Sequence, residues 1–323
     1  MTPEVAVVVA SHDRPLRLRW LLNALEEQTL ERERFEVIVV HDSQGTETEE
    51  LLRTHPLAAA GVLRHRSYAP GPGPAQKRNT GWREARAPLI AFTDDDCRPP
   101  EPWLANLLAA AHANPGAIVQ GSTRPDPDEL ELALRAPLAR SLTIDPPNAW
   151  GETANILYPR ALLETLGGFD ETFPVAAGED TDLYRRALAG GARCAGAPEA
   201  LNHHCVEVLG ARKTLKRLWR WRFLPAVVKR HPELRDPMPL RIFWKPRHAL
   251  FPLVLAALPL ARRRPLAALA LALPWALAAK PSYGSSPRGL LRSASELPTA
   301  ALVDAVEIAA CARGSVDHRS LLL

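Results

Sequence analysis

Cysteine is scarce in this chain of 323 residues, which contains four. Their positions, 97, 194, 205 and 311, form neither a CxxC metal knuckle nor the spacing of a disulfide framework. We therefore expect a reducing, cytosolic environment. No basic segment precedes the first apolar run, Val5–Ala10, and Glu4 stands directly before it. We therefore expect no signal peptide.

Long uninterrupted hydrophobic runs are also missing. Residues 249–261 and 265–279 are apolar, but Arg262, Arg263 and Arg264 separate them. As helices, the two runs would each extend about 20 Å, less than the ~30 Å hydrocarbon core of a bilayer. One helix across the whole stretch would bury the three arginines near its centre. The pattern disfavours a transmembrane helix and favours a shallow hairpin or a pair of interfacial helices. Helices packed on the rest of the protein are the alternative.

Acidic residues are nearly absent from residues 212–247, where Glu233 and Asp236 are the only two among many lysines and arginines. This imbalance suggests a polyanionic partner, such as lipid headgroups or phosphates. Aromatic residues, 6% of the whole chain, interleave with the basic ones here, at Trp219, Trp221, Phe223 and Trp244. That mixture can bind RNA, but the apolar runs that follow favour an anionic membrane surface. We expect contact through residues 212–279 and no nucleic-acid partner.

The first half of the chain contains short apolar runs that alternate with helical patterns. We expect strands at residues 5–10, 35–40, 62–65 and 88–92, and helices at 16–28, 46–53 and 75–87. Such alternation predicts βαβ units and a mostly parallel sheet flanked by helices. In sheets of this kind ligands bind beyond the carboxyl ends of the strands.

Three consecutive carboxylates, Asp94, Asp95 and Asp96, follow the fourth expected strand. Because side chains alternate along a strand, Asp94 and Asp96 should converge, with Asp95 facing away or bonding locally. Hard oxygen ligands suit Mg²⁺ or Mn²⁺. A polar loop without a metal is the alternative for this triplet alone. However, residues 11–13 and Asp42 end the first two strands, so three polar clusters should point into one crevice.

With these residues assembled, the chain resembles the family-2 glycosyltransferases, which are inverting enzymes with a GT-A fold. The resemblance covers roughly residues 4–210 and rests on the order and spacing of motifs at residues 7–14, 39–43, 77–81, 92–96, 167–171 and 178–182. One departure is His12-Asp13, where the family often has an aromatic residue followed by Asn. An imidazole stacks less strongly on a nucleotide base, which leaves the identity of the base open.

The resemblance implies a role for each motif. Asp180 matches the catalytic base of the family, and its neighbour Glu179 could orient the acceptor, although carboxylates there could also simply cap a helix. Asp96 would bind a Mg²⁺ or Mn²⁺ ion, and Asp94 would contact the metal shell or the ribose. One of His203 and His204 would complete the metal shell, and we favour His204. The alternative is that both histidines make structural contacts in a loop.

The remaining motif residues would bind the nucleotide-sugar, with a UDP-, GDP- or dTDP-linked sugar as the donor. Asp42 would accept hydrogen bonds from the base or the ribose, and Arg78 would face the phosphates or the base. Asn79 could brace the loop after the metal strand. The others expected to contact the donor are Ser11, His12, Asp13, Arg14 and Asp95. A zinc site is not expected, because His203, His204 and Cys205 are adjacent and the sequence offers no fourth ligand.

The sequence thus predicts an enzyme of the hexosyltransferase class. Residues 1–210 would form its catalytic domain, 211–245 a basic helical segment and 246–323 an apolar helical region. The acceptor would be a hydroxyl of a lipid-linked glycan, a polysaccharide or a small metabolite, and the protein would be cytoplasmic and peripheral on the inner face of the cell membrane. One alternative is a nucleotidyltransferase, although residues 11–15 lack the Gly-rich basic loop typical of that class. Another is a membrane-binding module with an inactive transferase domain.

Overall fold

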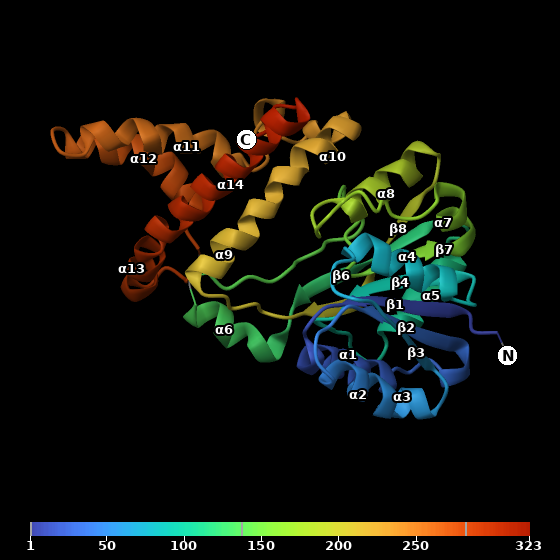
Figure 1. Ribbon diagram of the computed structural model, residues 1–323. Coiled ribbons are helices and arrows are strands. Elements are labelled where there is room, and N and C mark those ends of the chain that lie inside the picture. The colour runs from blue at the N-terminus through green and yellow to red at the C-terminus, as the bar shows by residue number, and fades with distance from the viewer. Residues whose placement is uncertain (1, 137, 282) are drawn as a thin grey trace. The chain divides into compact units, whose positions relative to one another are not determined.

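The computed structural model describes residues 2–136, 138–281 and 283–323. The chain divides into two compact units, one formed by Met1–Leu134 and Ala139–Glu207 and the other by Arg135–Leu138 and Val208–Leu323. The segments 211–245 and 246–323 both lie within the second unit. Figure 1 labels the elements of each unit.

An eight-stranded sheet organises the first unit. Its strands are β1 (Val5–Ser11), β2 (Phe35–His41), β3 (Leu63–Ser67), β4 (Leu89–Asp94), β5 (Cys97–Arg98), β6 (Ile118–Pro125), β7 (Ile156–Pro159) and β8 (Cys194–His204). They lie in the order β3-β2-β1-β4-β7-β6-β8-β5. The pairs among β1 to β4 and the pair β6–β8 are parallel, whereas β7 and β5 run antiparallel to their neighbours. The expected mostly parallel α/β sheet is confirmed.

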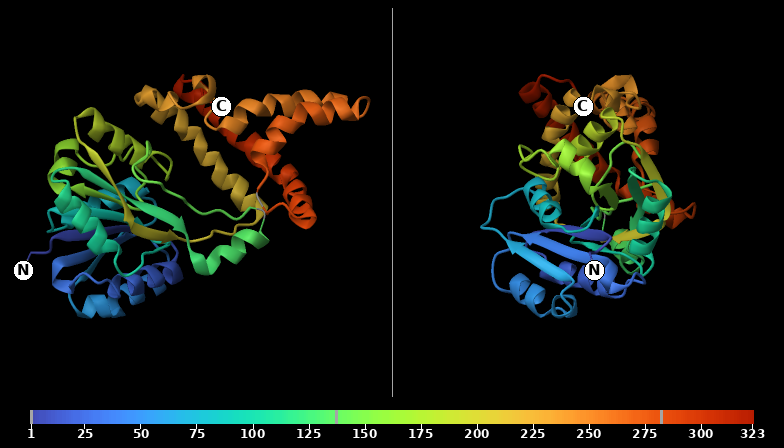
Figure 2. Two further views of the ribbon diagram at one scale, coloured as in Figure 1. Left: turned by 180° about the vertical axis from the view of Figure 1, so that it is seen from behind. Right: turned by 90° about the vertical axis from the view of Figure 1, so that its right-hand side faces the viewer.

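Helices cover both faces of this sheet. The central strands carry apolar side chains on both faces, and both faces must therefore be buried. The helices and short 3-10 turns of the first unit are α1 (Pro15–Glu26), η1 (Arg32–Arg34), α2 (Glu47–Thr54), α3 (Pro56–Ala59), α4 (Pro74–Glu84), α5 (Trp103–Ala113), η2 (Pro127–Glu129), α7 (Arg160–Leu166) and α8 (Glu179–Ala189); α6 (Leu130–Arg135) follows η2. One core packs α1, α2, α3 and α5 against Val5, Val7 and Val9 of β1. The other packs α4, α7 and α8 against Ala6 and Val8. Figures 1 and 2 show α1, α2 and α3 on one face and α4 on the other.

The strand β8 is the main element of this unit that the sequence analysis did not anticipate. Its eleven residues carry no clean alternation of buried and exposed side chains, and Gly196 and Pro198 interrupt them. Pairing with β6 and β5 holds it in the sheet. His203 and His204 therefore lie in a strand, so the alternative that placed both histidines in a loop is wrong.

The second unit is helical. Its elements are α9 (Ala211–Leu218), η3 (Trp219–Phe223), α10 (Leu224–Arg230), η4 (Pro232–Arg235), η5 (Pro239–Arg241), α11 (Pro246–Ala257), η6 (Leu258–Leu260), α12 (Pro265–Ala279), α13 (Pro287–Ser295) and α14 (Leu297–His318). Phe251 of α11 packs edge-on against Trp275 of α12, with ring centroids 5.9 Å apart. The Trp275 indole N–H donates to Asp304 of α14 at 2.9 Å. Among the described residues, no helix combines the length and apolar character that a bilayer crossing requires.

Candidate functional site

The carboxyl ends of β1, β2 and β4 lie at one edge of the sheet and carry the predicted polar clusters. In the register of the sheet Ala10 pairs with Asp94, and Ser11 pairs with His41. The residues that follow each strand must therefore emerge side by side. The structure brings residues 11–14, Asp42 and Asp94–Asp96 together, as the strand pattern predicted.

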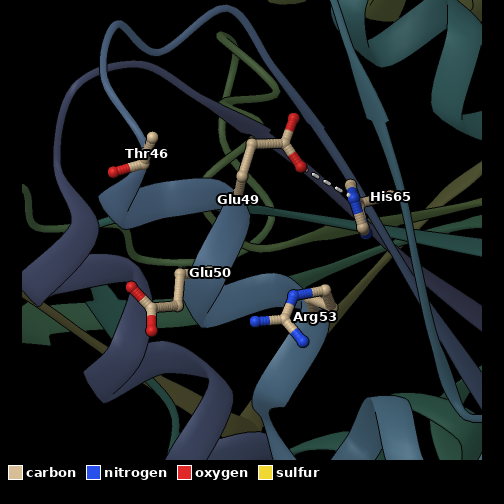
Figure 3. Close-up of a pocket in the computed structure, with 5 residues that line it drawn as sticks. All are labelled: Thr46, Glu49, Glu50, Arg53 and His65. Atoms are coloured by element: carbon tan, nitrogen blue, oxygen red, sulfur yellow. Dashed lines mark hydrogen bonds and ion pairs between the residues drawn. The ribbon is translucent and has the colours of Figure 1, made fainter.

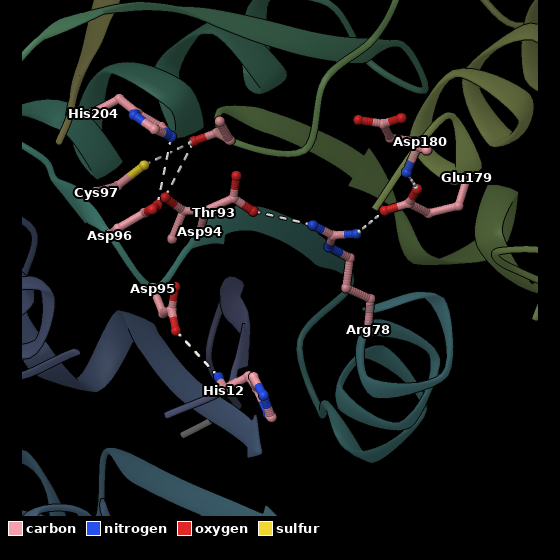
Figure 4. Close-up of polar contacts among 12 residues, drawn as sticks. His12, Arg78, Thr93, Asp94, Asp95, Asp96, Cys97, Glu179, Asp180 and His204 are labelled. Atoms are coloured by element: carbon pink, nitrogen blue, oxygen red, sulfur yellow. Dashed lines mark hydrogen bonds and ion pairs between the residues drawn. The ribbon is translucent and has the colours of Figure 1, made fainter. Parts of the chain in front are cut away.

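Asp95 faces the end of β1 and does not bond locally, contrary to one expectation. Its carboxylate accepts from the Ser11 hydroxyl at 2.8 Å and from the His12 backbone N–H at 3.3 Å, and it also pairs with Arg14. Burial raises the pKa of Asp95 to about 6, although the Arg14 charge opposes the shift. Figure 4 shows the Asp95 side chain directed toward His12, on the side of the chain opposite to His204.

Asp96 points toward β8. Its carboxylate pairs with Arg14, and one oxygen lies 3.5 Å from Nε2 of His204. The antiparallel pairing of Cys97 with His204 sets this approach. Ligand atoms of Asp96, His204 and Cys205 all lie within 4.8 Å of one another. Of the two adjacent histidines, His204 is therefore the one beside Asp96, and His203 pairs in register with Arg98.

Arg78 of α4 connects the acids of β4 to the start of α8. Its guanidinium donates to Asp94 Oδ1 at 3.1 Å and to Glu179 Oε1 at 2.7 Å, as Figure 4 shows. Asp180 follows Glu179 directly and accepts from the Thr181 backbone N–H at 2.8 Å. Burial, and then the neighbouring Glu179 charge, raise the pKa of Asp180 to about 7, although Arg78 opposes the shift. Asp180 is thus poised to exchange a proton near neutral pH.

Lys77 is a member of the site that the sequence analysis left out. Its ammonium group is buried and donates to Asp42 Oδ1 at 2.5 Å and to the Ser11 carbonyl at 2.9 Å. His12 approaches the same Asp42 oxygen at 2.9 Å. Burial alone would raise the pKa of Asp42, but the hydrogen bond and charge of Lys77 outweigh it and lower the pKa. A lysine next to Arg78 on the buried face of α4, close to strand ends rich in acids, was the available signal.

Asp13 and Asn79, both predicted to bind the donor, make hydrogen bonds to loop and turn residues. The Asp13 carboxylate accepts from the Gln44 backbone N–H at 2.6 Å, and this links the loops after β1 and β2. Asn79 lies elsewhere than expected: its amide bonds Phe169, Glu171 and Trp82 at 2.7 to 2.9 Å. These bonds occupy both ends of the Asn79 side chain. Asn79 therefore braces the turn at residues 167–171 and does not brace the loop after β4.

A separate hollow lies between α2 and β3, shown in Figure 3. It is lined by Thr46, Glu49, Glu50, Arg53 and His65, and His65 Nε2 lies 3.0 Å from Glu49. None of these five residues belongs to the clusters at the strand ends. The hollow is therefore separate from the candidate site, which lies at the strand ends.

The residues at the ends of β4 and β8 fit a divalent cation by their donor chemistry. Asp94 and Asp96 offer carboxylate oxygens, and His204 offers an imidazole nitrogen. The His204 Nδ1 lies 2.9 Å from the Cys205 carbonyl, so that it donates its proton there and leaves Nε2 as a free lone pair toward Asp96. Mixed oxygen and nitrogen donors of this kind suit Mn²⁺ and related ions.

Comparison with known proteins identifies relatives of this chain. Residues 6–165 match the family model described as "Glycosyl transferase family 2". A validoxylamine A glucosyltransferase of Streptomyces hygroscopicus subsp. jinggangensis is 29% identical over 224 residues, covering 58% of this chain and 52% of the relative. A pre-mycofactocin glycosyltransferase of Mycobacterium tuberculosis is 30% identical over 217 residues, covering 62% of this chain and 42% of the relative. The chain thus spans about half the length of the curated relatives it matches.

Solved structures share the fold. The mannosyltransferase PcManGT from Pyrobaculum calidifontis, in complex with GDP-Man and Mn²⁺, superimposes with a TM-score of 0.60 at 23% identity. That match covers 98% of this chain and 88% of the other. The TarS 1–349 fragment from S. aureus, in complex with UDP, has a TM-score of 0.51 at 15% identity, covering 98% of this chain and 92% of the fragment.

Proposed function

The chain belongs to glycosyl transferase family 2, and from this premise we propose that it transfers a sugar from a nucleotide-sugar to an acceptor hydroxyl with inversion at the anomeric carbon. The single observation that carries the proposal is the double contact of Arg78, which ties Asp94 at the donor edge to Glu179 beside Asp180. It supports a donor site and a base on adjoining elements. The names of the curated relatives favour sugar transfer over nucleotidyl transfer.

Asp180 is the general base in this proposal. Its carboxylate takes the proton of the acceptor hydroxyl while the hydroxyl oxygen attacks the anomeric carbon on the face opposite the leaving diphosphate. The raised pKa of Asp180, about 7, matches a base that works near neutral pH. Glu179 holds Arg78 in place and orients the acceptor.

The donor lies along the ends of β1, β2 and β4. Asp42 accepts from the base or ribose, with Lys77 and His12 holding its carboxylate in place. Arg14, whose side chain is 38% exposed, can reach the diphosphate, because its guanidinium forks match phosphate oxygens. Asp94, Asp96 and His204 would hold a Mg²⁺ or Mn²⁺ ion, which when bound would neutralise charge on the departing diphosphate. The fold neighbours bind GDP-Man with Mn²⁺, and UDP.

A thermal-shift screen of UDP, GDP and dTDP, and of their sugars, with Mn²⁺ tests the donor assignment. A ligand that binds only the folded state raises the unfolding temperature with its occupancy. We expect one nucleoside diphosphate to stabilise the wild type and the Asp180→Asn variant equally, with sugar transfer lost in the variant alone. Transfer retained in the Asp180→Asn variant would refute its role as the base. The absence of any stabilising nucleotide would refute the donor site.

We also propose that the second unit binds an anionic membrane surface, through the hairpin of α11 and α12. Figure 1 shows these two helices side by side. The hairpin exposes six leucines, five of them more than half exposed: Leu255, Leu258, Leu266, Leu269, Leu273 and Leu277. The three arginines 262–264 at its turn are exposed as well. Exposed leucines next to exposed arginines suit the boundary between acyl chains and anionic headgroups. The protein would then work as a peripheral enzyme on the inner face of the cell membrane.

Flotation with vesicles tests this surface in the full-length chain. We expect binding to vesicles with anionic lipid, weaker binding to neutral vesicles, and loss of binding when Arg262, Arg263 and Arg264 are replaced by Glu. The control is Leu16→Asp, which alters an exposed leucine of the first unit and should leave binding unchanged. Equal binding of the wild type and the Glu variant would place membrane contact elsewhere or exclude it.

A further inference from the structure

A cysteine thiol stands beside Asp96 and His204, two of the three residues proposed to hold the cation. Cys205 is buried, with 5% of its surface exposed. Its backbone N–H donates to the Asp96 carbonyl at 3.0 Å, and its thiol hydrogen-bonds to the Asp96 carboxylate. The ligand atoms of Asp96, His204 and Cys205 all lie within 4.8 Å of one another. His204 and Cys205 are adjacent in the sequence, and the fold adds Asp96 to this group from the turn between β4 and β5.

The backbone of Cys205 also prepares His204 for coordination. The Cys205 carbonyl accepts from His204 Nδ1 at 2.9 Å, which assigns the ring proton to Nδ1. The other nitrogen, Nε2, then presents its lone pair 3.5 Å from Asp96 Oδ1. An outer hydrogen bond that orients a histidine in this way is a general feature of metal sites.

Building on the proposed function, we propose that Cys205 joins Asp96 and His204 to form a set of three protein ligands at the cation position. It makes this position selective for thiophilic divalent ions, such as Zn²⁺, Cd²⁺ and Co²⁺, over Mg²⁺, so that these ions compete with the working cation and inhibit transfer. A thiolate, an imidazole and a carboxylate form a donor set that soft and borderline ions prefer. Three protein ligands leave a fourth position open, as in many zinc sites.

The binding step balances without a redox change. The thiol S–H bond breaks, a sulfur–metal bond forms, and the proton passes to solvent. Each thiophilic ion bound should therefore release one proton more than the same ion releases when Cys205 is replaced by Ser.

Cys97 supplies a matched control. It is also buried, it follows Asp96 directly, and it pairs with His204 across the strands. Its sulfur, however, lies 3.9 Å from the Ala154 carbonyl, and Cys97 is not part of the three-ligand group. Cys97→Ser therefore removes a neighbouring thiol of similar burial and leaves the proposed ligands in place.

The experiment is a Co²⁺ titration of the metal-free, full-length protein, followed by absorption in the near ultraviolet without any nucleotide. We expect a sulfur-to-cobalt charge-transfer band in the wild type and in Cys97→Ser, and no such band in Cys205→Ser. By calorimetry, Cys205→Ser should weaken Cd²⁺ binding by about tenfold or more and change Mg²⁺ binding by less than about twofold.

Absence of the band in the wild type, or its persistence in Cys205→Ser, overturns the proposal. Should Cys205→Ser fail to fold by circular dichroism, the wild type still decides: Zn²⁺ must release bound Mn²⁺, measured by electron paramagnetic resonance, at about stoichiometric amounts. No release overturns the proposal. The result of this experiment does not depend on whether the proposed function is correct. A thiolate band without sugar transfer would refute only the transferase role, and transfer without a band would refute only the cysteine ligand.

Discussion

Arg78 and Glu179 are separated by 101 positions in the chain, but the Arg78 guanidinium lies 2.7 Å from Glu179 Oε1 in the folded protein. The same guanidinium reaches Asp94 at 3.1 Å. Arg78 is 6% exposed and Glu179 is 2% exposed, so the pair is shielded from the solvent that would otherwise weaken it. Through this pair the edge of the sheet and the N-terminus of α8 are held in one arrangement.

Replacing Arg78 by Lys should disrupt that arrangement while keeping the positive charge. A lysine ammonium is a point charge and cannot span both carboxylates with a planar fork. We expect sugar transfer to fall by about 10²-fold, because a small misplacement of catalytic groups is costly. The measurement is kcat/KM, with Arg83→Lys as the control. Arg83 lies on the same helix and is half exposed, with a longer contact of 3.5 Å to Glu171. Equal losses in both variants would contradict a specific role for Arg78.

The pH dependence of transfer should report Asp180. Its pKa is raised to about 7, and only the carboxylate form can accept a proton. We therefore expect kcat/KM to fall about tenfold for each pH unit below 7. In Glu179→Gln the neighbouring negative charge is gone, so this acidic limb should move to lower pH. Glu164→Gln, which alters an exposed carboxylate of α7, should leave the limb unmoved. If the acidic limb stayed in place in Glu179→Gln, the pKa seen in the pH profile would belong to a group other than Asp180.

The same pKa has a consequence for stability. The folded state binds the Asp180 proton more tightly than the unfolded chain does, because its pKa is raised from 3.8 to about 7. Asp180 therefore lowers the free energy of unfolding as pH rises from about 4 to 7. Asp180→Asn removes this contribution. We expect urea denaturation to show the variant gaining stability over the wild type at pH 8 relative to pH 5. An unchanged difference between the two pH values would contradict the raised pKa.

The buried pair of Lys77 and Asp42 should be strongly coupled. Replacing Lys77 by Met leaves the Asp42 carboxylate buried without its main counter-charge, which costs about 3–5 kcal/mol of unfolding free energy. Adding Asp42→Asn removes the stranded charge and should recover much of that loss. The measurement is a double-mutant cycle by urea denaturation at pH 7. Additive effects of the two substitutions would exclude the coupling.

Gly168 should tolerate a methyl group less well than its neighbour Gly167. Both have a left-handed backbone, with φ of 77° and 74°. An alanine at either position therefore introduces a similar backbone strain of roughly 1–2 kcal/mol. A Cβ on Gly168 would lie 2.3 Å from the Asn79 side-chain oxygen, whereas one on Gly167 meets nothing within 4 Å. Asn79 cannot yield easily, because four hydrogen bonds hold its amide.

We therefore expect Gly168→Ala to cost about 1–3 kcal/mol more than Gly167→Ala in thermal or urea unfolding. Comparing the two alanine variants cancels most of the backbone strain and isolates the clash with Asn79. Equal destabilisation by the two alanines would mean that Asn79 does not brace this turn tightly.

The alternation of apolar runs with helical patterns was enough to predict the parallel part of the sheet, because each run needs only its own residues to reveal its period. The same local logic placed Asp42 and Asp94–Asp96 at strand ends, and parallel pairing then made their meeting a geometric consequence. The identity of the family followed from the order of these motifs, and the match to residues 6–165 confirms it.

What the sequence by itself determined, then, were features encoded by neighbouring residues: strand ends, helix starts and the motifs they carry. The tertiary structure alone decided which distant side chains share a contact. It buried Lys77 against Asp42, turned Asn79 toward residues 167–171, and set His204 rather than His203 beside Asp96 through the pairing of β5 with β8. The physical reason is that pairing partners and side-chain directions depend on long-range packing, and no local periodicity records them.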